Sequence, residues 1–356
     1  MSYGVVSGRA APGARRVVVS VNGRVAGARP LRAGSSRGRR FWLRVVLPMA
    51  DASVRVTTLS GDGSSSSRVV RDVFGLPEAA QPKVVRARED PVLARTLRPL
   101  ARGFSGTGGL YVQSLTSGGG AAWNARARFP AASTLKLAIA VTALAGHSGI
   151  PLRGSYVDRL FREMIVVSDD EAANLMEIWM AGSTSAGSAR VNAMMRSIGL
   201  VDSIMYGGYL VREPSARIPV RVDEQPSFGV GKYTTAWDMT QLWRAVWLAS
   251  GGLGPLGKAQ PGFTPADARY LLWLLAHVRD TRKLDANLRG RDGVCVLHKA
   301  GWISKARHDT GLVFWRGGVF VAGVMTWRST GVGPASDRLA GRVASLSYRR
   351  FRSLRG

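Results

Sequence analysis

Residues 129–136 read Phe-Pro-Ala-Ala-Ser-Thr-Leu-Lys and open a nearly all-apolar segment that runs to Gly146. The apolar run predicts a buried helix, and glycine commonly follows the last turn of one. Side chains three residues apart share a helix face, so the hydroxyl of Ser133 and the amine of Lys136 are expected side by side. An apolar wall would lower the pKa of Lys136 and let its neutral amine act as a base. The free N–H groups at the helix start could receive the oxyanion formed when Ser133 attacks a carbonyl.

Taken alone, this Ser-x-x-Lys pattern also describes a helix cap followed by a lysine that reaches solvent. Three later segments favour the catalytic interpretation: Ser168-Asp169-Asp170, then Thr234-Thr235 with Asp238-Met239, then His298-Lys299-Ala300-Gly301-Trp302. An ordered set of four segments is far more specific than any one of them. The set resembles the active-site motifs of class A β-lactamases and their penicillin-binding relatives over roughly residues 89–356.

This resemblance implies a role for each matching residue. Ser133 would be the nucleophile, and Lys136, or a glutamate acting through water, would remove its proton. Ser168 would pass a proton to the leaving nitrogen. Lys299 would attract the substrate carboxylate, and the N–H groups of Ser133 and Trp302 would form the oxyanion hole.

Two positions depart from the family pattern. Asp170 replaces an asparagine, so a donor to the substrate is lost and a negative charge near Lys136 should favour the protonated amine. Ala300 replaces a threonine or serine and removes a hydroxyl that would help hold the substrate carboxylate. The resemblance implies that both positions line the substrate-binding site together with Gly301 and Trp302.

A glutamate that activates water for deacylation is the least defined part of the pattern. Glu213, within Arg212-Glu213-Pro214, locally resembles the family position, and Glu224 is a second candidate. A solvated loop carboxylate is the alternative interpretation of both. If neither reaches the ester, water attack is slow and the acylated serine persists.

Three functions therefore remain open. The first is a β-lactamase-like serine hydrolase that acylates Ser133 with a β-lactam or a related amide and then hydrolyses the ester. The second is a penicillin-binding peptidase or sensor that acts on cell-wall peptides and deacylates slowly. The third is a catalytically degenerate scaffold whose arginine-rich surface binds an anionic polymer.

The predicted fold class is α+β. Strand-like runs at 110–115, 121–129, 294–298, 310–315 and 319–327 enclose a series of helical segments, and a helix is expected over 336–350. With the resemblance, this pattern predicts a β-lactamase/transpeptidase-like domain over 89–356, formed by an antiparallel sheet and a helical subdomain.

The N-terminal part is expected to form a separate domain. Strand-like runs at 15–21, 39–47 and 53–59, with Asn22-Gly23 as a turn, predict a small immunoglobulin-like β-sandwich over 15–80. Gly61-Asp62-Gly63 and the serine run at 64–67 are expected to break this pattern. Residues 1–14 are predicted to be a flexible N-terminus and 81–88 a linker.

The formal net charge is +27, and only seven of the 50 basic residues are lysines. This charge favours contact with an anionic cell-wall or membrane surface, although a general bias toward arginine explains it equally well. We expect a β-lactam or cell-wall peptide as the small-molecule partner, no nucleic acid, and a monomer.

The remaining chemistry-bearing residues predict no further site. Cys295 lies in an apolar run and is interpreted as core packing, and the four histidines show no metal-ligand spacing. We therefore expect neither a metal nor a cofactor. No signal peptide or membrane-spanning segment is predicted, and an extracytoplasmic location is expected from the resemblance alone.

Overall fold

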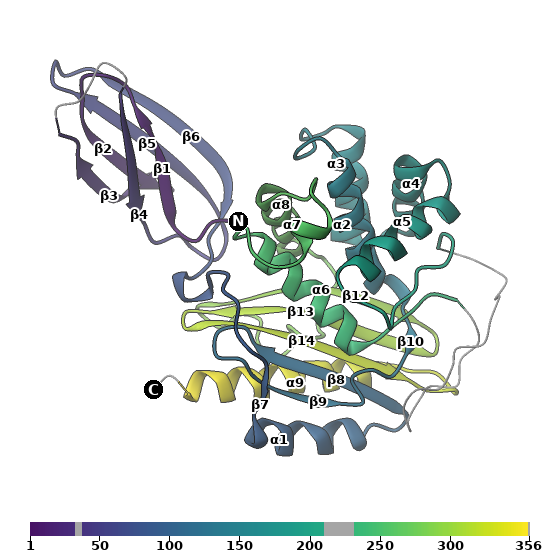
Figure 1. Ribbon diagram of the computed structural model, residues 1–356. Coiled ribbons are helices and arrows are strands. Elements are labelled where there is room, and N and C mark those ends of the chain that lie inside the picture. The colour runs from purple at the N-terminus through teal and green to yellow at the C-terminus, as the bar shows by residue number, and fades with distance from the viewer. Residues whose placement is uncertain (33–37, 210–230, 355–356) are drawn as a thin grey trace. The chain divides into compact units, whose positions relative to one another are not determined.

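The computed structural model describes residues 1–32, 38–209 and 231–354 of the chain (Figure 1). The chain divides into two compact units, Met1–Gln81 and Pro82–Gly356. The division lies at the start of the predicted linker. No helix among the described residues is both long and apolar enough to span a membrane.

The N-terminal unit consists of two antiparallel sheets around a small core. One sheet has the order β3 (Arg24–Pro30), β2 (Ala14–Val21), β5 (Asp51–Ser60), β6 (Ser65–Phe74), and the other pairs β1 (Val5–Ala10) with β4 (Arg39–Arg44). Asn22 and Gly23 both have positive φ, as the hairpin turn between β2 and β3 requires. The buried residues alternate along the strands, and the core is formed by Ala10, Ala14, Val17, Val19, Phe41, Leu43, Val45 and Val54.

Two expectations for this unit are wrong. Residues 5–10 of the predicted flexible N-terminus form β1, which pairs with β4 along its whole length. The serine run at 64–67, interpreted as a break, begins β6. Neither strand shows the alternation of buried and exposed residues by which a strand is recognised in a sequence. Residues 65–72 of β6 are all exposed, and β1 contains only one buried residue.

The C-terminal unit is built on a six-stranded sheet. Its order is β12 (Val294–Ile303), β13 (Ala306–Trp315), β14 (Gly318–Trp327), β8 (Thr107–Ser114), β9 (Gly119–Trp123), β7 (Arg88–Glu89). All neighbouring pairs are antiparallel except β7 and β9. Strands from both ends of the unit therefore meet in one sheet, as the sequence predicts.

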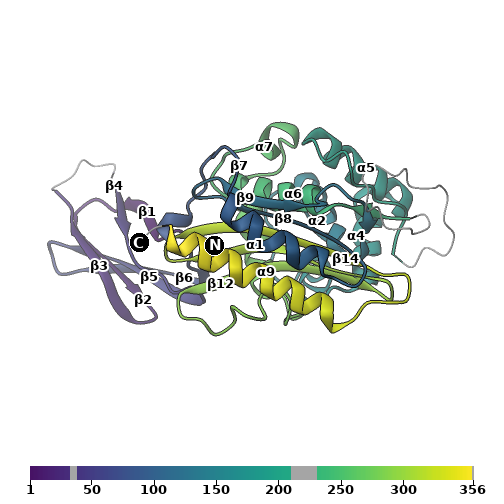
Figure 2. The ribbon, with the colours of Figure 1, turned by 90° about the horizontal axis from the view of Figure 1, so that it is seen from below.

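Helices cover both faces of this sheet. The first and last helices of the unit, α1 (Pro91–Arg102) and α9 (Pro334–Ser353), lie side by side on one face (Figure 2). They bury Leu93, Leu97, Val343 and Phe351 against strand residues such as Phe320. On the opposite face, α6 (Ala236–Ala249) packs on β8, β13 and β14, and α8 (Pro265–Ala276) packs on β12.

A helical subdomain surrounds α2 (Lys136–Gly146), which is buried over residues 136–144. It contacts α4 (Asp170–Ala181), α5 (Thr184–Ser197) and α8. The remaining elements are short: η1 (Glu78–Ala80), β10 (Phe129–Pro130), η2 (Ala132–Leu135), α3 (Tyr156–Arg162), η3 (Glu163–Val167), β11 (Tyr233–Thr234) and α7 (Leu256–Ala259). The buried α2 thus begins, at Lys136, directly after η2, which contacts the edge strand β12.

Candidate active site

Ser133 lies in a tight turn directly before α2. The turn is the 3-10 helix η2, and the α-helix begins at Lys136 rather than at the serine. Ala132, the residue before Ser133, has a φ of 46°, a left-handed conformation that costs energy for a residue other than glycine. Ser133 is half-buried, whereas Lys136 is fully buried. The change of helix type therefore falls between the serine and the lysine of the motif.

Ser168 connects the two lysines of the motifs. It follows the π-helical turn η3 and has a left-handed backbone with a φ of 65°. Its carbonyl oxygen accepts a hydrogen bond from Lys136 Nζ at 2.5 Å, and its Oγ accepts one from Lys299 Nζ at 2.6 Å. Residues from α2, from the turn after η3 and from β12 thus meet at one point.

Lys299 is buried in β12, with 1% of its surface exposed. Its Nζ also donates to the carbonyl of Ala300 at 3.0 Å. Burial lowers the pKa of Lys299 to about 7, and the nearby charge of Lys136 acts in the same direction. This amine can therefore change its charge near neutral pH.

Asp170 contacts Lys136 as its position in the motif predicts. Its Oδ1 accepts a hydrogen bond from Lys136 Nζ at 2.5 Å, and the carboxylate side chain is 44% exposed. Burial lowers the pKa of Lys136, and the hydrogen bond and charge of Asp170 oppose this effect without cancelling it. The sequence predicted both effects, but which of the two is larger depends on how completely the amine is buried by packing.

Gly301 lets β12 approach the serine turn. A Cβ atom at this position would lie 2.8 Å from Ser133 N and 2.9 Å from Thr134 N, closer than side-chain carbons come to backbone atoms. Ala300 is buried, and Trp302, next along the strand, is 62% exposed. The strand that carries Lys299 therefore runs beside the backbone N–H groups of Ser133 and Thr134.

Tyr209 is a residue of this site that the sequence analysis did not identify. Its ring centroid lies 4.7 Å from Lys136 Nζ and 4.5 Å from Lys232 Nζ. Tyr209 N donates to Asn174 Oδ1 at 2.6 Å, and Asn174 Nδ2 donates to the carbonyl of Tyr209 at 3.3 Å. Asn174 lies in α4, after the Ser168 motif, and its polar side chain is the sequence feature that could have indicated a backbone partner at this site. These two hydrogen bonds hold the tyrosine backbone against α4.

The carboxylates near the site have different surroundings. Glu177 is fully buried on α4, where its Oε1 accepts from Ser188 Oγ at 2.8 Å, and burial raises its pKa to about 7. Asp238 is buried in the first turn of α6, where its Oδ2 accepts hydrogen bonds from Asp202 N and Ser203 Oγ, so it supports the loop that contains these two residues. Within the described part of the chain, Asp170 is the only carboxylate that forms an ion pair with Lys136.

Glu213 and Glu224, the two predicted deacylating residues, lie outside the described residues. The described ranges also contain no group of three or more side chains that could hold a metal ion.

A family model described as "Beta-lactamase enzyme family" matches residues 92–148 and 151–351. The chain belongs to this family. The match lies entirely within the C-terminal unit and covers all four motif segments. Among curated proteins, no sequence matches the chain.

Solved structures with the same fold cover most of the chain of this beta-lactamase family member. PBP-A has a TM-score of 0.60 and 21% identity, and the match covers 76% of this chain and all of PBP-A. The ancestral (GNCA) class A β-lactamase has a TM-score of 0.57 and 22% identity, with 73% of this chain and all of that one covered. A β-lactamase from Sphaerobacter thermophilus DSM 20745 has a TM-score of 0.57 and 19% identity, and the match covers 73% of this chain and 97% of that one. The C-terminal unit thus has the β-lactamase/transpeptidase-like fold.

Membership of the beta-lactamase enzyme family supports a serine hydrolase. The positions of Lys136, Ser168 and Lys299 are consistent with the acyl transfer expected of such an enzyme.

Proposed function

We propose that the C-terminal unit is a β-lactamase-like serine hydrolase that forms an acyl-enzyme on Ser133 with β-lactams or related amides. The observation that carries the proposal is the chain of contacts from Lys299 Nζ through Ser168 to Lys136 Nζ, three residues after Ser133. Lys136 is a buried amine of lowered pKa, and Ser133, three residues before it, is half-buried; an activated serine requires such a base within reach.

In the proposed acylation step, Ser133 Oγ attacks the carbonyl carbon of the amide while the neutral amine of Lys136 takes the hydroxyl proton. The N–H groups at the start of η2 and on β12 stabilise the oxyanion. The C–N bond then breaks, and Ser168 donates its hydroxyl proton to the leaving nitrogen. Lys299 restores that proton through its hydrogen bond to Ser168 Oγ and, while protonated, attracts the substrate carboxylate.

A second candidate is a penicillin-binding peptidase or sensor whose acyl-enzyme persists. Tyr209 favours it, because an aromatic ring, which cannot activate water, lies beside Lys136. Its hydroxyl is buried and has no hydrogen-bond partner among the described residues. A mutant of PBP-A has been solved as an acyl-enzyme complex with penicillin G, which makes a stable ester compatible with this fold.

One experiment tests both candidates. The full-length protein is exposed to a fluorescent penicillin and washed, and its intact mass is followed while turnover of a chromogenic cephalosporin is measured. Turnover that disappears in Ser133→Ala, but not in the exposed-serine control Ser65→Ala, supports the hydrolase. A long-lived adduct on Ser133 supports the second candidate. Absence of any adduct and of turnover contradicts both and leaves the anionic-polymer scaffold, which predicts salt-dependent binding without labelling.

A further inference from the structure

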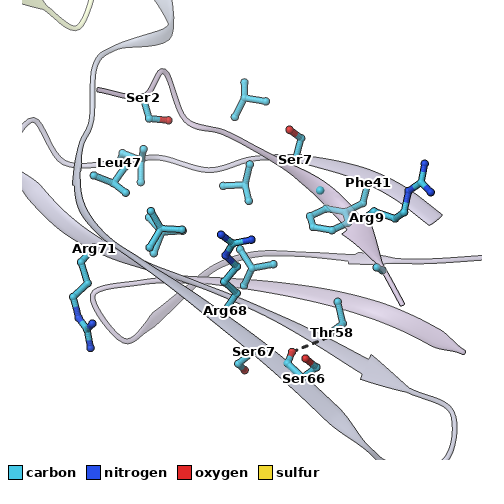
Figure 3. A pocket seen from close by; sticks show the side chains of 18 of the residues that line it. Ser2, Ser7, Arg9, Phe41, Leu47, Thr58, Ser66, Ser67, Arg68 and Arg71 are labelled. Carbon is cyan, nitrogen blue, oxygen red and sulfur yellow. Dashed lines mark hydrogen bonds between the residues drawn. The ribbon is translucent and has the colours of Figure 1, made fainter. Parts of the chain in front are cut away.

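The N-terminal unit contains a pocket of about 770 Å³ that none of the catalytic motifs contacts. Strand β1, in the two-stranded sheet, and strand β6, at one edge of the four-stranded sheet, both line it. Figure 3 shows these strands on either side of a group of hydrophobic side chains. The hydrophobic lining includes Val6, Phe41, Val54 and Val56.

Both lining strands have a free hydrogen-bonding edge. Among the strands that the structure describes, β1 pairs only with β4, and β6 pairs only with β5. Within the described chain, no backbone hydrogen bond from a turn or loop reaches residues 5–9 or 66–71. Such an edge presents a row of N–H and C=O groups that can pair with another extended chain. Val5 and Val70 are each 47% exposed there, so hydrophobic surface accompanies the free edges.

The register of β5 and β6 places an arginine on the inner face of the sheet. Val54 pairs with Val70, and Val56 pairs with Arg68. Residues directly opposite one another in an antiparallel pair lie on the same face. Val54 is buried in the core, so this face is the inner one. Figure 3 shows the guanidinium of Arg68 among the hydrophobic side chains of the pocket.

The charge of the pocket is positive. Arg9, Arg68 and Arg71 line it together with one carboxylate, Asp72, and the side chain of none of the three arginines forms an ion pair or hydrogen bond with another described residue. Residues 1–77 contain 13 arginines and three aspartates, with no lysine or glutamate, for a net charge of +10. A guanidinium on an apolar face is stabilised by a carboxylate that pairs with it in two hydrogen bonds.

We propose that the groove between β1 and β6 binds an extended peptide segment with acidic side chains. The peptide backbone adds to the free edge of β6, its hydrophobic residues cover the lining valines, and its carboxylates pair with Arg68 and the neighbouring arginines. A six-residue segment, the length of β1, spans ~20 Å in this conformation. A polymer without backbone amides would leave the strand edges and the hydrophobic lining unused, so a peptide fits the groove better.

The test uses the full-length protein and a short fluorescent peptide of alternating valine and glutamate, with binding followed by anisotropy. The native protein is expected to bind the peptide saturably. In Arg68→Glu the affinity should fall about tenfold or more, because roughly one strong charge pair is lost. Arg24→Glu is the matched control, because this exposed arginine of β3 lies outside the pocket and its charge change is the same. The same peptide with N-methylated valines should bind far more weakly, because it cannot complete the strand pairing. Ser133→Ala should bind normally, since the proposal is independent of acylation.

Three results would overturn the proposal. If the N-methylated peptide or polyphosphate binds as tightly and with the same dependence on Arg68, the site is a general polyanion surface. If the peptide does not bind and Arg68→Val makes the protein self-associate, the arginine only protects an edge strand from pairing. If Arg68→Glu and Arg24→Glu weaken binding equally, the pocket is not the binding site.

Discussion

Lys299 Nζ lies 2.6 Å from Ser168 Oγ, although 131 residues separate the two in the chain. This contact joins the edge strand β12 to the helical subdomain, and Lys136 joins it from the other side through the carbonyl of Ser168. Because a serine bridges two buried amines, the charge of each lysine influences the other. The pH dependence of acylation should therefore report on both.

The rate of acylation should pass through a maximum as pH increases. A lysine loses its proton as pH rises through its pKa, so neutral Lys136, the base, becomes more abundant with pH. Lys299, whose pKa is about 7, loses at the same time the charge that attracts the substrate carboxylate. Lys299→Arg should abolish the descending limb, because arginine keeps its charge. Stopped-flow labelling across pH, with the exposed Lys258→Arg as control, checks this, and a rate that only rises in the native protein contradicts it.

Replacing Asp170 with asparagine should accelerate acylation at neutral pH. The carboxylate opposes the lowering of the pKa of Lys136, so its removal lets that pKa fall further and leaves more of the amine neutral. The ascending limb of the pH profile should move to lower pH. Glu171→Gln, an exposed neighbour, should not move it. An unchanged limb in Asp170→Asn would show that Lys136 is not the titrating base.

A methyl group at position 301 should damage the site. In Gly301→Ala the new Cβ meets the backbone nitrogens of Ser133 and Thr134, which must shift. The expected cost in the free energy of unfolding is about 1–3 kcal/mol, with a larger relative loss of acylation rate. Gly257→Ala is the control, because nothing lies within 4 Å of its added carbon. Chemical denaturation and labelling kinetics measure the two effects, and equal behaviour of both variants would rule out the close approach of β12.

Tyr209 should control the lifetime of the acyl-enzyme. Tyr209→Ala removes the ring beside Lys136 and opens space for water, so release of the penicilloyl group should become faster. Tyr209→Phe keeps the ring and removes a buried hydroxyl without a described partner, so it should leave the lifetime unchanged and stability equal or slightly higher. Intact mass against time after penicillin exposure distinguishes the variants. Faster release in Tyr209→Phe would assign the effect to the hydroxyl instead of the ring.

Much of the C-terminal fold could be predicted because its elements have strong local signals. The apolar run after Ser133 is the buried α2, and the three C-terminal strand runs are β12, β13 and β14. The strands of the N-terminal unit were harder to predict. β6 begins with four polar residues and shows no alternation of buried and exposed positions. The pairing of β6 with β5, interrupted only by a register shift at residues 71–72, is a property of the sheet and not of the side chains of β6.

The sequence by itself determined which hydroxyl and amine side chains occur in the four motif segments and in which order, because these are local features of the chain. It indicated an apolar setting for Lys136, but it did not determine the burial of Lys299. The low pKa of Lys136 and Lys299 comes from burial, and burial depends on the packing of segments more than a hundred residues apart. Only the tertiary structure placed Tyr209 on Lys136 and Arg68 on an inner sheet face, since both positions result from chain pairing that no local pattern encodes.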